Sequence, residues 1–190
     1  MIALGNDVVD LTEAPRNGEN YYHRLIQVAF SSQEMDQLSS RFSLEIKCAI
    51  LWSAKEAAYK SLKKCGNTME FSPKEMSVLV PNQDGLELQG IVQTKEHKFV
   101  LSTSISEGWV HSLTYLMSAD VPTFQVIACE KDPVSQSRIV REQALHHFKS
   151  ADAIEKNQQG IPQFFRQGVL VPNELSLSHH HQVAAFAFQS

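Results

Sequence analysis

The stretch WSAKEAAYK, residues 52–60, combines an aromatic, an acidic and a basic side chain at helical spacing. Trp52, Glu56 and Lys60 are four residues apart, so a helix would place them on one face. A glutamate–lysine pair at this spacing commonly serves only to stabilise a helix surface, by about 0.2–0.5 kcal/mol. The same two groups also supply a carboxylate that can ligate a metal or accept a proton, and a cation that can contact a phosphate. The spacing alone leaves both interpretations open.

Further carboxylates lie in the stretch LGNDVVDL near the start of the chain, at Asp7 and Asp10. Taken alone, an acid at the end of a strand is more often a turn former or a helix cap. Mg²⁺ prefers oxygen ligands and usually takes one or two protein carboxylates, leaving its other positions to water and substrate phosphates. One carboxylate from this strand and one from the 52–60 helix would meet that need, with Lys60 beside the phosphates.

Three consecutive histidines, His179–His181, follow Ser178 in the stretch LSLSHHH. Neighbouring side chains in a strand point to opposite faces, so three in a row cannot all ligate one ion. The helical HExxH pattern is absent as well, which disfavours a zinc hydrolase. Ser178 and His179 are better suited to hold a phosphate through a hydroxyl, a ring N–H and backbone N–H groups. A polar strand end that faces solvent is the alternative.

The elements that would position these residues are of mixed type. A long helical pattern over residues 43–64 carries Glu56 and Lys60, and Gly66 ends it. Shorter helices are expected over 20–30, over 31–40 with a capping box, and over 132–150 with Asp132 as N-cap. Strand patterns cover residues 1–11, 75–81, 86–94, 98–105, 109–117, 123–130 and 174–188, with short loop and strand pieces before the last. The pattern indicates an α+β protein.

Composition restricts the class of protein. The net charge of −4 argues against a general nucleic-acid binder. Three scattered cysteines fit a reducing compartment better than a disulfide scaffold. We find no signal peptide and no apolar stretch near the roughly 18 residues of a membrane span, so we expect a cytoplasmic protein without membrane association.

Two of these stretches together resemble the 4′-phosphopantetheinyl transferases. LGNDVVDL resembles the apolar-Gly-x-Asp opening of that family, and LWSAKEAAYKSL matches its Trp/Phe-Ser/Ala-x-Lys-Glu-Ala/Ser-x-x-Lys motif at almost every position. The spacing of the motifs and the strands that follow also suit the family. The resemblance covers residues 4 to about 118.

The C-terminal stretch carries a resemblance of its own. GIP…ELSLSHHH is similar to a Gly-Lys/Arg-Pro…Ile/Leu-Ser-His stretch that precedes the Gly-x-Asp motif in the two-lobed, surfactin-synthetase-type members. Here it comes last, so the chain looks like a two-lobed transferase with its lobes in swapped order. The resemblance implies two similar α+β lobes about a pseudo-twofold axis, over residues 1–118 and 119–190, with the active site between them.

The resemblance also implies an activity and roles for residues. The family transfers 4′-phosphopantetheine from coenzyme A to a serine of an acyl or peptidyl carrier protein, with Mg²⁺. By analogy Asp7 and Glu56 would be the magnesium ligands, and Lys60 would contact the phosphates and help the leaving group. Ser178 and His179 would hold the nucleotide end of coenzyme A. Trp52 would pack beneath the site, and Glu56 would be the general base, either directly or through a water on the metal.

Departures from the family pattern support a second reading. Two-lobed members often carry a further acid two residues after the first Asp, where this chain has Val9, as holo-acyl-carrier-protein synthases do; Asp10 is displaced by one residue. Ile161 stands where the family has a Lys or Arg that contacts a phosphate. These differences favour the alternative of a non-catalytic coenzyme A or carrier-protein-binding module of the same fold.

The expected partner is an acidic carrier protein. Residues 47–64 contain Lys47, Lys55, Lys60, Lys63 and Lys64 against one acid, and we expect Lys63 and Lys64 on the docking rim. Cations that favour the C-terminal end of a helix dipole are the structural alternative. Two lobes in one chain predict a monomer, because the second lobe would replace the neighbouring subunit of the single-lobed relatives.

Overall fold

The computed structural model describes residues 3–12, 19–67, 70–116 and 121–189. We refer to residues 3–116 as the N-terminal part and to residues 121–189 as the C-terminal part. The boundary that the sequence predicts, at residues 118 and 119, lies outside the described residues.

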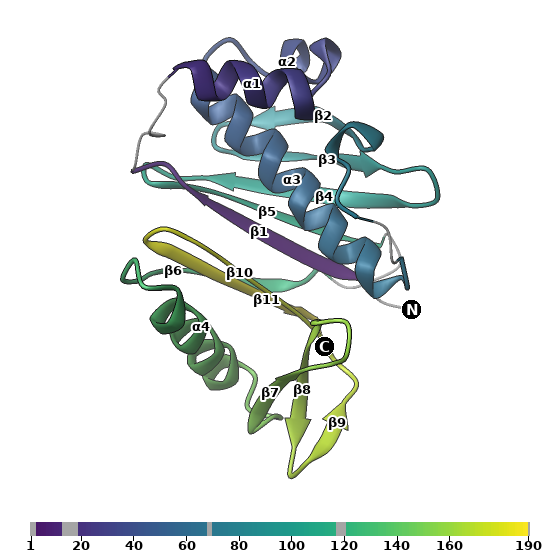
Figure 1. Cartoon of the computed structure of the whole chain (residues 1–190), viewed down its shortest axis with the longest axis vertical. Coiled ribbons are helices and arrows are strands. Elements are labelled where there is room, and N and C mark those ends of the chain that lie inside the picture. Colours follow the sequence, from purple (N-terminus) through teal and green to yellow (C-terminus); the bar gives the residue numbers. More distant parts are fainter. Residues whose placement is uncertain (1–2, 13–18, 68–69, 117–120, 190) are drawn as a thin grey trace.

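An antiparallel five-stranded sheet forms the N-terminal part, in the order β1-β5-β4-β3-β2 (Figure 1). Its first strand lies at the edge that faces the C-terminal part, which leaves β2 at the opposite edge. The strands are β1 (Leu4–Asp10), β2 (Ser77–Asp84), β3 (Glu87–Gln93), β4 (Lys98–Ile105) and β5 (Trp109–Tyr115).

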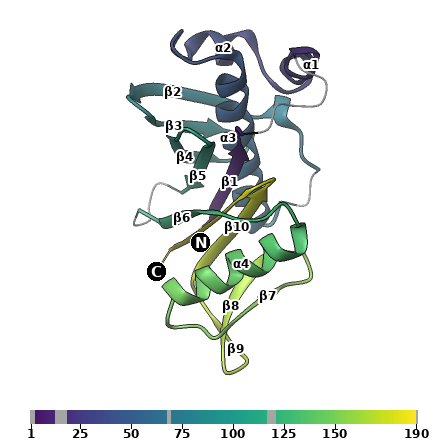
Figure 2. The same ribbon diagram turned by 90° about the vertical axis from the view of Figure 1, so that its left-hand side faces the viewer.

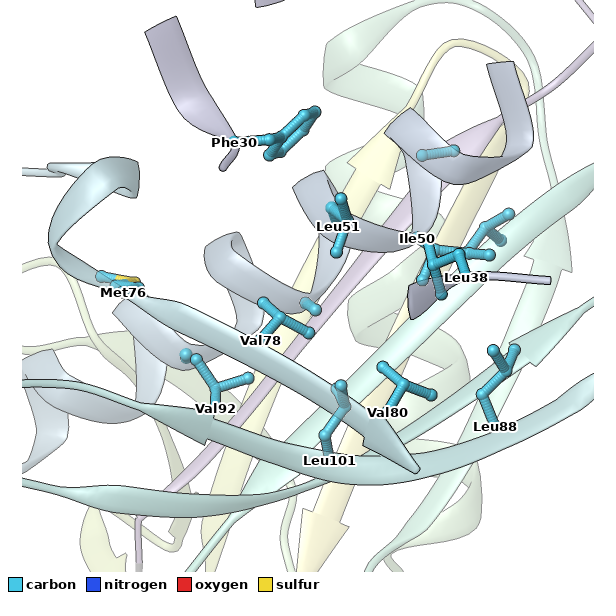
Figure 3. Packing of buried hydrophobic residues seen from close by; sticks show 14 of the residues in the cluster. Phe30, Leu38, Ile50, Leu51, Met76, Val78, Val80, Leu88, Val92 and Leu101 are labelled. Carbon is cyan, nitrogen blue, oxygen red and sulfur yellow. The ribbon is translucent and has the colours of Figure 1, made fainter. Parts of the chain in front are cut away.

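One long helix, α3 (Leu44–Lys64), crosses a face of this sheet (Figure 1). Ser43 caps its start by accepting a hydrogen bond from the Ile46 N–H, and Gly66 follows its end with φ +86°. The apolar face of the helix packs on inward-facing strand residues such as Val78 and Leu101 (Figure 3). The predicted helix over 43–64 is therefore confirmed nearly to the residue.

Short elements lie near α3. They are α1 (Glu19–Ala29), α2 (Ser32–Gln37) and the 3₁₀ turn η1 (Pro73–Glu75). Of these, α1 and η1 contact α3, whereas α2 contacts β2. Ser31 and Glu34 form the expected capping box at the start of α2. Glu34 also reaches α3, where its carboxylate pairs with the Nζ of Lys55 at 2.8 Å.

The C-terminal part holds two further antiparallel sheets and one helix (Figures 1 and 2). One sheet has the order β10-β11-β6, and the other has the order β7-β8-β9. A second core of apolar side chains joins α4 to these sheets and includes Val140, Phe164 and Phe186. The elements are β6 (Thr123–Ala128), α4 (Pro133–His147), β7 (Ala153–Lys156), β8 (Pro162–Arg166), β9 (Val169–Val171), β10 (Glu174–His180) and β11 (Val183–Gln189).

The prediction of a single strand over 174–188 is wrong. The stretch forms a hairpin in which β10 and β11 pair antiparallel from Glu174↔Gln189 to His180↔Val183. His181 makes the turn with φ +49°, a left-handed conformation that is uncommon for a residue other than glycine. Because the turn carries no Gly, Asn or Asp, the sequence gives no ordinary hairpin signal here.

Strand β1 lies against β10 of the C-terminal part (Figure 2). Side chains from alternate positions of β10 make the polar contacts between them. The Asn6 N–H donates to Ser176 Oγ at 2.9 Å, and the Asp10 N–H donates to His180 Nδ1 at 3.0 Å. Leu175 and Leu177, at the other alternate positions of β10, pack in the second core. The alternation of polar and apolar side chains along β10 thus places its polar face against β1 and its apolar face in the second core.

No helix among the described residues combines the length and apolar character that a membrane crossing requires.

Candidate functional site

Asp7 and Lys60 meet where α3 crosses β1. The Nζ of Lys60 lies 2.8 Å from Asp7 Oδ1 and donates to the Asn6 carbonyl at 2.9 Å. The close approach depends on Gly5, because a Cβ there would lie 2.0 Å from the carbonyl oxygen of Ala57 in the helix. Asp7 and Lys60 are 14% and 28% exposed, so the pair lies at a partly open site.

Glu56 lies one helical turn before Lys60 and shares the site with Asp7. Burial raises the pKa of the Glu56 carboxyl, and the negative charge of Asp7 raises it further, while Lys60 acts in the opposite sense. The influence of Asp7 indicates that the two carboxylates are close enough to repel each other. The structure therefore brings together the three residues that the two N-terminal motifs predict.

These carboxylates are a suitable donor set for Mg²⁺. Among the described residues, no group of three or more His, Cys, Asp and Glu side chains is placed to hold a metal ion. A two-carboxylate site still fits Mg²⁺, which completes its shell with water and phosphate oxygens. Burial is the main cause of the raised pKa of Glu56, and a divalent cation would relieve the repulsion by Asp7 that adds to it.

Beside these residues is a cavity of about 280 Å³ between α3 and the C-terminal part. Glu56 and Lys60 line it from α3, and His179 lines it from β10. Its wall is rich in cations, which suits a ligand with several phosphates. The basic residues of the lining are Lys60, Lys63, Lys64, Arg141 and Lys156.

His179 lies within this cluster of cations. Burial lowers the pKa of its imidazole, and the nearby Lys60 and Lys156 lower it further. At neutral pH the ring is thus biased toward its neutral form, with one N–H donor and one acceptor nitrogen. His179 thus lines the cavity, and its predicted role in holding the nucleotide end of coenzyme A stays a prediction.

Ser178 has a different position from the one expected for a ligand-contacting hydroxyl. The residue is 4% exposed, and Ser178 is not part of the cavity lining. Its Oγ accepts a hydrogen bond from Asn6 Nδ2 at 3.2 Å instead. Successive residues of a strand face opposite ways, so only one of the pair Ser178–His179 can face the cavity.

The remaining residues of the helical motif form its surroundings. Trp52 packs edge-to-face on Phe71 with ring centroids 5.5 Å apart, and Tyr59 lies 5.2 Å from the same ring. Lys55 is fully buried and donates to the carbonyls of Ala29 and Pro73. The aromatic residues thus flank Glu56 on α3, and Lys55 anchors the helix from behind.

Lys64 does not lie on an exposed rim. Its side chain is 5% exposed, pairs with Glu174 at 3.0 Å and donates to the Leu175 carbonyl at 2.6 Å. The prediction that Lys64 belongs to a docking rim is therefore wrong, because the C-terminal part covers it. Lys63 is half-buried and its Nζ lies 5.2 Å from the ring centroid of Tyr59.

The side chain of Asp10 has a structural role, because its carboxylate accepts hydrogen bonds from neighbouring segments. Its Oδ1 accepts hydrogen bonds from the N–H and Oγ1 of Thr12, and its Oδ2 accepts one from the Gln182 N–H at 2.8 Å. The carboxylate therefore holds the β10–β11 turn against the end of β1. As the period of the strand predicts, Asp10 does not join Asp7.

Sequence reasoning missed Arg141 and Lys156 as lining residues. They come from α4 and β7 and meet in space at the cavity, so no local spacing signals them. Ile161 lines the same cavity, and its backbone N–H donates to Asn157 Oδ1. Lys156 thus places a cation on the wall that Ile161 also lines.

A comparison with family models identifies one match. The 4′-phosphopantetheinyl transferase superfamily model matches residues 3–114, more than half of the chain. No curated protein and no solved structure matches the sequence. The matched segment contains Asp7, Glu56 and Lys60, which meet at one site, and ends before the C-terminal part. The chain therefore belongs to the 4′-phosphopantetheinyl transferase superfamily.

Proposed function

We propose that this protein transfers the 4′-phosphopantetheine group from coenzyme A to a serine of an acyl or peptidyl carrier protein. The observation that carries the proposal is that Glu56 and Lys60 line a cavity rich in cations, while Asp7 pairs with Lys60 beside it. Family membership supports a transferase, and this arrangement suits a substrate that contains a pyrophosphate.

The nucleotide end of coenzyme A would occupy the cavity between α3 and the C-terminal part. Arg141, Lys156 and His179 offer donors to its phosphates from the C-terminal wall. Lys60 offers one from the opposite wall, beside Asp7. The pyrophosphate would thus lie next to the two carboxylates. Ser178 would support His179 from behind rather than contact the ligand.

Asp7 and Glu56 would hold Mg²⁺. The bound ion would neutralise the pyrophosphate charge that the paired carboxylates would otherwise repel. Lys60 orients the Asp7 carboxylate through its 2.8 Å contact, so one carboxylate is already positioned for the ion.

In the reaction, the serine oxygen of the carrier protein forms a bond to the β-phosphorus of coenzyme A. The bond from that phosphorus to the bridging oxygen breaks, and 3′,5′-ADP leaves with the oxygen. Glu56 accepts the serine proton, a role that its raised pKa favours near neutral pH. Lys60 stabilises the charge that develops on the leaving phosphate.

The strand order supports a two-lobed origin, and we propose on the sequence resemblance that the lobes are in swapped order. In the N-terminal part the first strand, β1, pairs with the last, β5, which pairs with β4. In the C-terminal part β6, β11 and β10 repeat this arrangement. In each part a helix, α3 or α4, lies in the sequence between the first strand and the last two strands. These parallels favour two related lobes about a pseudo-twofold axis, as in surfactin-synthetase-type members, within a monomer.

The proposed acceptor is an acidic carrier protein that docks beside the cavity. Lys63 remains a candidate contact, since it lines the cavity and is half-buried rather than covered. Free cysteines at Cys48, Cys65 and Cys129 are consistent with a cytoplasmic location, where such carrier proteins would be modified.

Mass spectrometry of an apo acyl carrier protein tests the proposal. The carrier is incubated with this protein, coenzyme A and Mg²⁺, and the expected product is a phosphopantetheine adduct on its serine. Glu56→Ala and Lys60→Ala run in parallel, and both should abolish or strongly reduce the adduct. Omitting Mg²⁺ with a chelator should do the same.

The absence of an adduct on several acyl and peptidyl carrier proteins would contradict the proposal. If calorimetry still detected coenzyme A binding, the protein would be a non-catalytic binding module of this fold. If neither were detected, the family fold would be retained without either function.

A further inference from the structure

Asn6 touches both parts of the molecule at the candidate site. It is fully buried between Gly5 and Asp7. Its carbonyl accepts a hydrogen bond from the Lys60 Nζ at 2.9 Å. Its backbone N–H donates to Ser176 Oγ at 2.9 Å, and its side-chain Nδ2 donates to Ser178 Oγ at 3.2 Å. One residue therefore joins the cation beside Asp7 to the strand that carries His179.

The partner of this amide on the other side is His111 of β5. Asn6 Nδ2 lies 3.3 Å from His111 Nε2, and His111 stacks on Phe124 with ring centroids 4.7 Å apart. Burial lowers the pKa of His111 to about 3, so the ring is neutral at physiological pH. Asn6 is thus held from three elements, β5, β10 and α3, which limits the conformations of its side chain.

A structural role alone does not account for a polar residue at this position. The Asn6 Oδ1 is buried without a hydrogen-bond partner among the residues that the structure describes. A buried acceptor without a partner costs stability, and an apolar side chain of similar size would avoid that cost. The side-chain contacts to Ser178 and His111 are what the asparagine adds in return.

We propose that Asn6 is a positioning residue that sets the separation between Lys60 and His179 across the nucleotide cavity. Its contact to Ser178 fixes where β10 lies along β1, and His179 is the next residue of β10. Its carbonyl fixes the Nζ of Lys60. A ligand with a nucleotide and a pyrophosphate would contact both walls, so a small displacement between them would weaken its binding. The inference rests on the proposed function, because it assumes that coenzyme A occupies this cavity.

Calorimetric binding of coenzyme A tests the inference with three variants. Asn6→Leu removes the amide, and Ser178→Ala removes the same contact from the other strand. We expect each to raise the Kd about five- to tenfold, the effect of losing one hydrogen bond. The double variant should bind about as well as either single variant, because both changes remove one shared contact.

Ser53→Ala is the matched control. It removes a hydrogen bond of 2.7 Å to Ser112 that is equally buried but lies within the N-terminal part, and its Kd should not change. Asn6→Leu leaves Ser178 Oγ and His111 Nε2 without the amide, and Ser53→Ala also removes a buried hydrogen bond, so urea unfolding should give the two variants similarly lowered midpoints. A weaker Kd in Asn6→Leu alone, at a similar loss of stability, is a result that a purely structural role would not give.

Several outcomes would overturn the inference. One is an unchanged Kd in Ser178→Ala, which requires no change in β1 and stays informative if Asn6→Leu does not fold. Others are additive effects in the double variant or an equal loss in Ser53→Ala. Wild-type protein that did not bind coenzyme A would overturn the proposed function as well, whereas wild-type binding with unaffected variants would overturn this inference alone.

Discussion

The Nζ of Lys60 lies 2.8 Å from Oδ1 of Asp7, which links the end of the helical motif to the first strand. The two residues are 53 positions apart in sequence, and the contact forms because α3 packs directly on β1 at Gly5. A lysine in this place orients the carboxylate and faces the cavity at the same time.

Lys60→Met should lower the kcat of phosphopantetheine transfer by about 10²–10³, as loss of a preorganised charge-stabilising donor does in other enzymes. The side chain keeps a similar length without its charge. The rate of carrier-protein modification measures the effect. Lys98→Met, at the exposed start of β4, makes the same change of charge elsewhere and should leave the rate unaltered. Equal losses in the two variants would contradict a specific role for Lys60.

Glu56→Gln should abolish transfer and raise the melting temperature at pH 7. Folding the wild type costs free energy because burial and Asp7 raise the pKa of Glu56 and so disfavour its charged form. An acid with a raised pKa favours the folded state below its unfolded pKa and loses that contribution as pH rises through the folded pKa. The gain in melting temperature of Glu56→Gln over the wild type, measured without Mg²⁺, should therefore vanish at acidic pH.

The wild-type pH–rate profile provides an independent check on the same residue. If Glu56 accepts the serine proton, the rate should fall on the acidic side around a pKa above that of an ordinary glutamate. A flat profile down to the pH at which the carrier protein unfolds would argue against Glu56 as the base.

The sequence predicted the positioning elements of the site because local patterns determine them. The period of apolar residues and the caps at Ser43 and Gly66 specify α3, and therefore the common face of Glu56 and Lys60. The meander of β2 to β5 follows from alternation and turn residues. Asp7 could be assigned to the site only through the family resemblance, because its strand, β1, pairs with β5, which is distant in the sequence.

Features that depend on contacts between distant segments were not predicted. The hairpin at His181 has no turn signature, and the burial of Lys64 depends on Glu174, which is distant in the sequence. The place of Ser178 is instructive, since strand period shows that it and His179 face opposite ways but not which one faces the ligand. Arg141 and Lys156 meet only through packing of the C-terminal part.

Glu34→Gln should destabilise the protein by about 3–5 kcal/mol, because it leaves the buried Lys55 ammonium without its counter-charge. The carboxylate also accepts hydrogen bonds from the Ser31 and Val78 N–H groups, so it joins α2, α3 and β2. Urea unfolding measures the effect. Lys55→Met combined with Glu34→Gln should be less destabilising than the sum of the single changes, since neither then leaves a lone charge.

A surface pair supplies the control for this prediction. Arg138 and Glu142 are four residues apart on α4, 3.0 Å from each other and more than half exposed. Glu142→Gln should change the free energy of unfolding by no more than about 0.5 kcal/mol. A comparable loss of unfolding free energy in both variants would show that burial does not make the Lys55–Glu34 pair more important to stability than a surface pair.

Gly5→Ala should reduce transfer by about 100-fold or more, because a small displacement of catalytic groups has effects of this size. A Cβ on residue 5 would lie 2.0 Å from the Ala57 carbonyl oxygen and 2.9 Å from the Ser61 N, so α3 must move away from β1. That movement separates Glu56 and Lys60 from Asp7. Gly108→Ala is the matched control, since its Cβ would meet only Thr12 Cγ2 at 3.4 Å. Full activity in Gly5→Ala would mean that the site does not require this close packing of helix and strand.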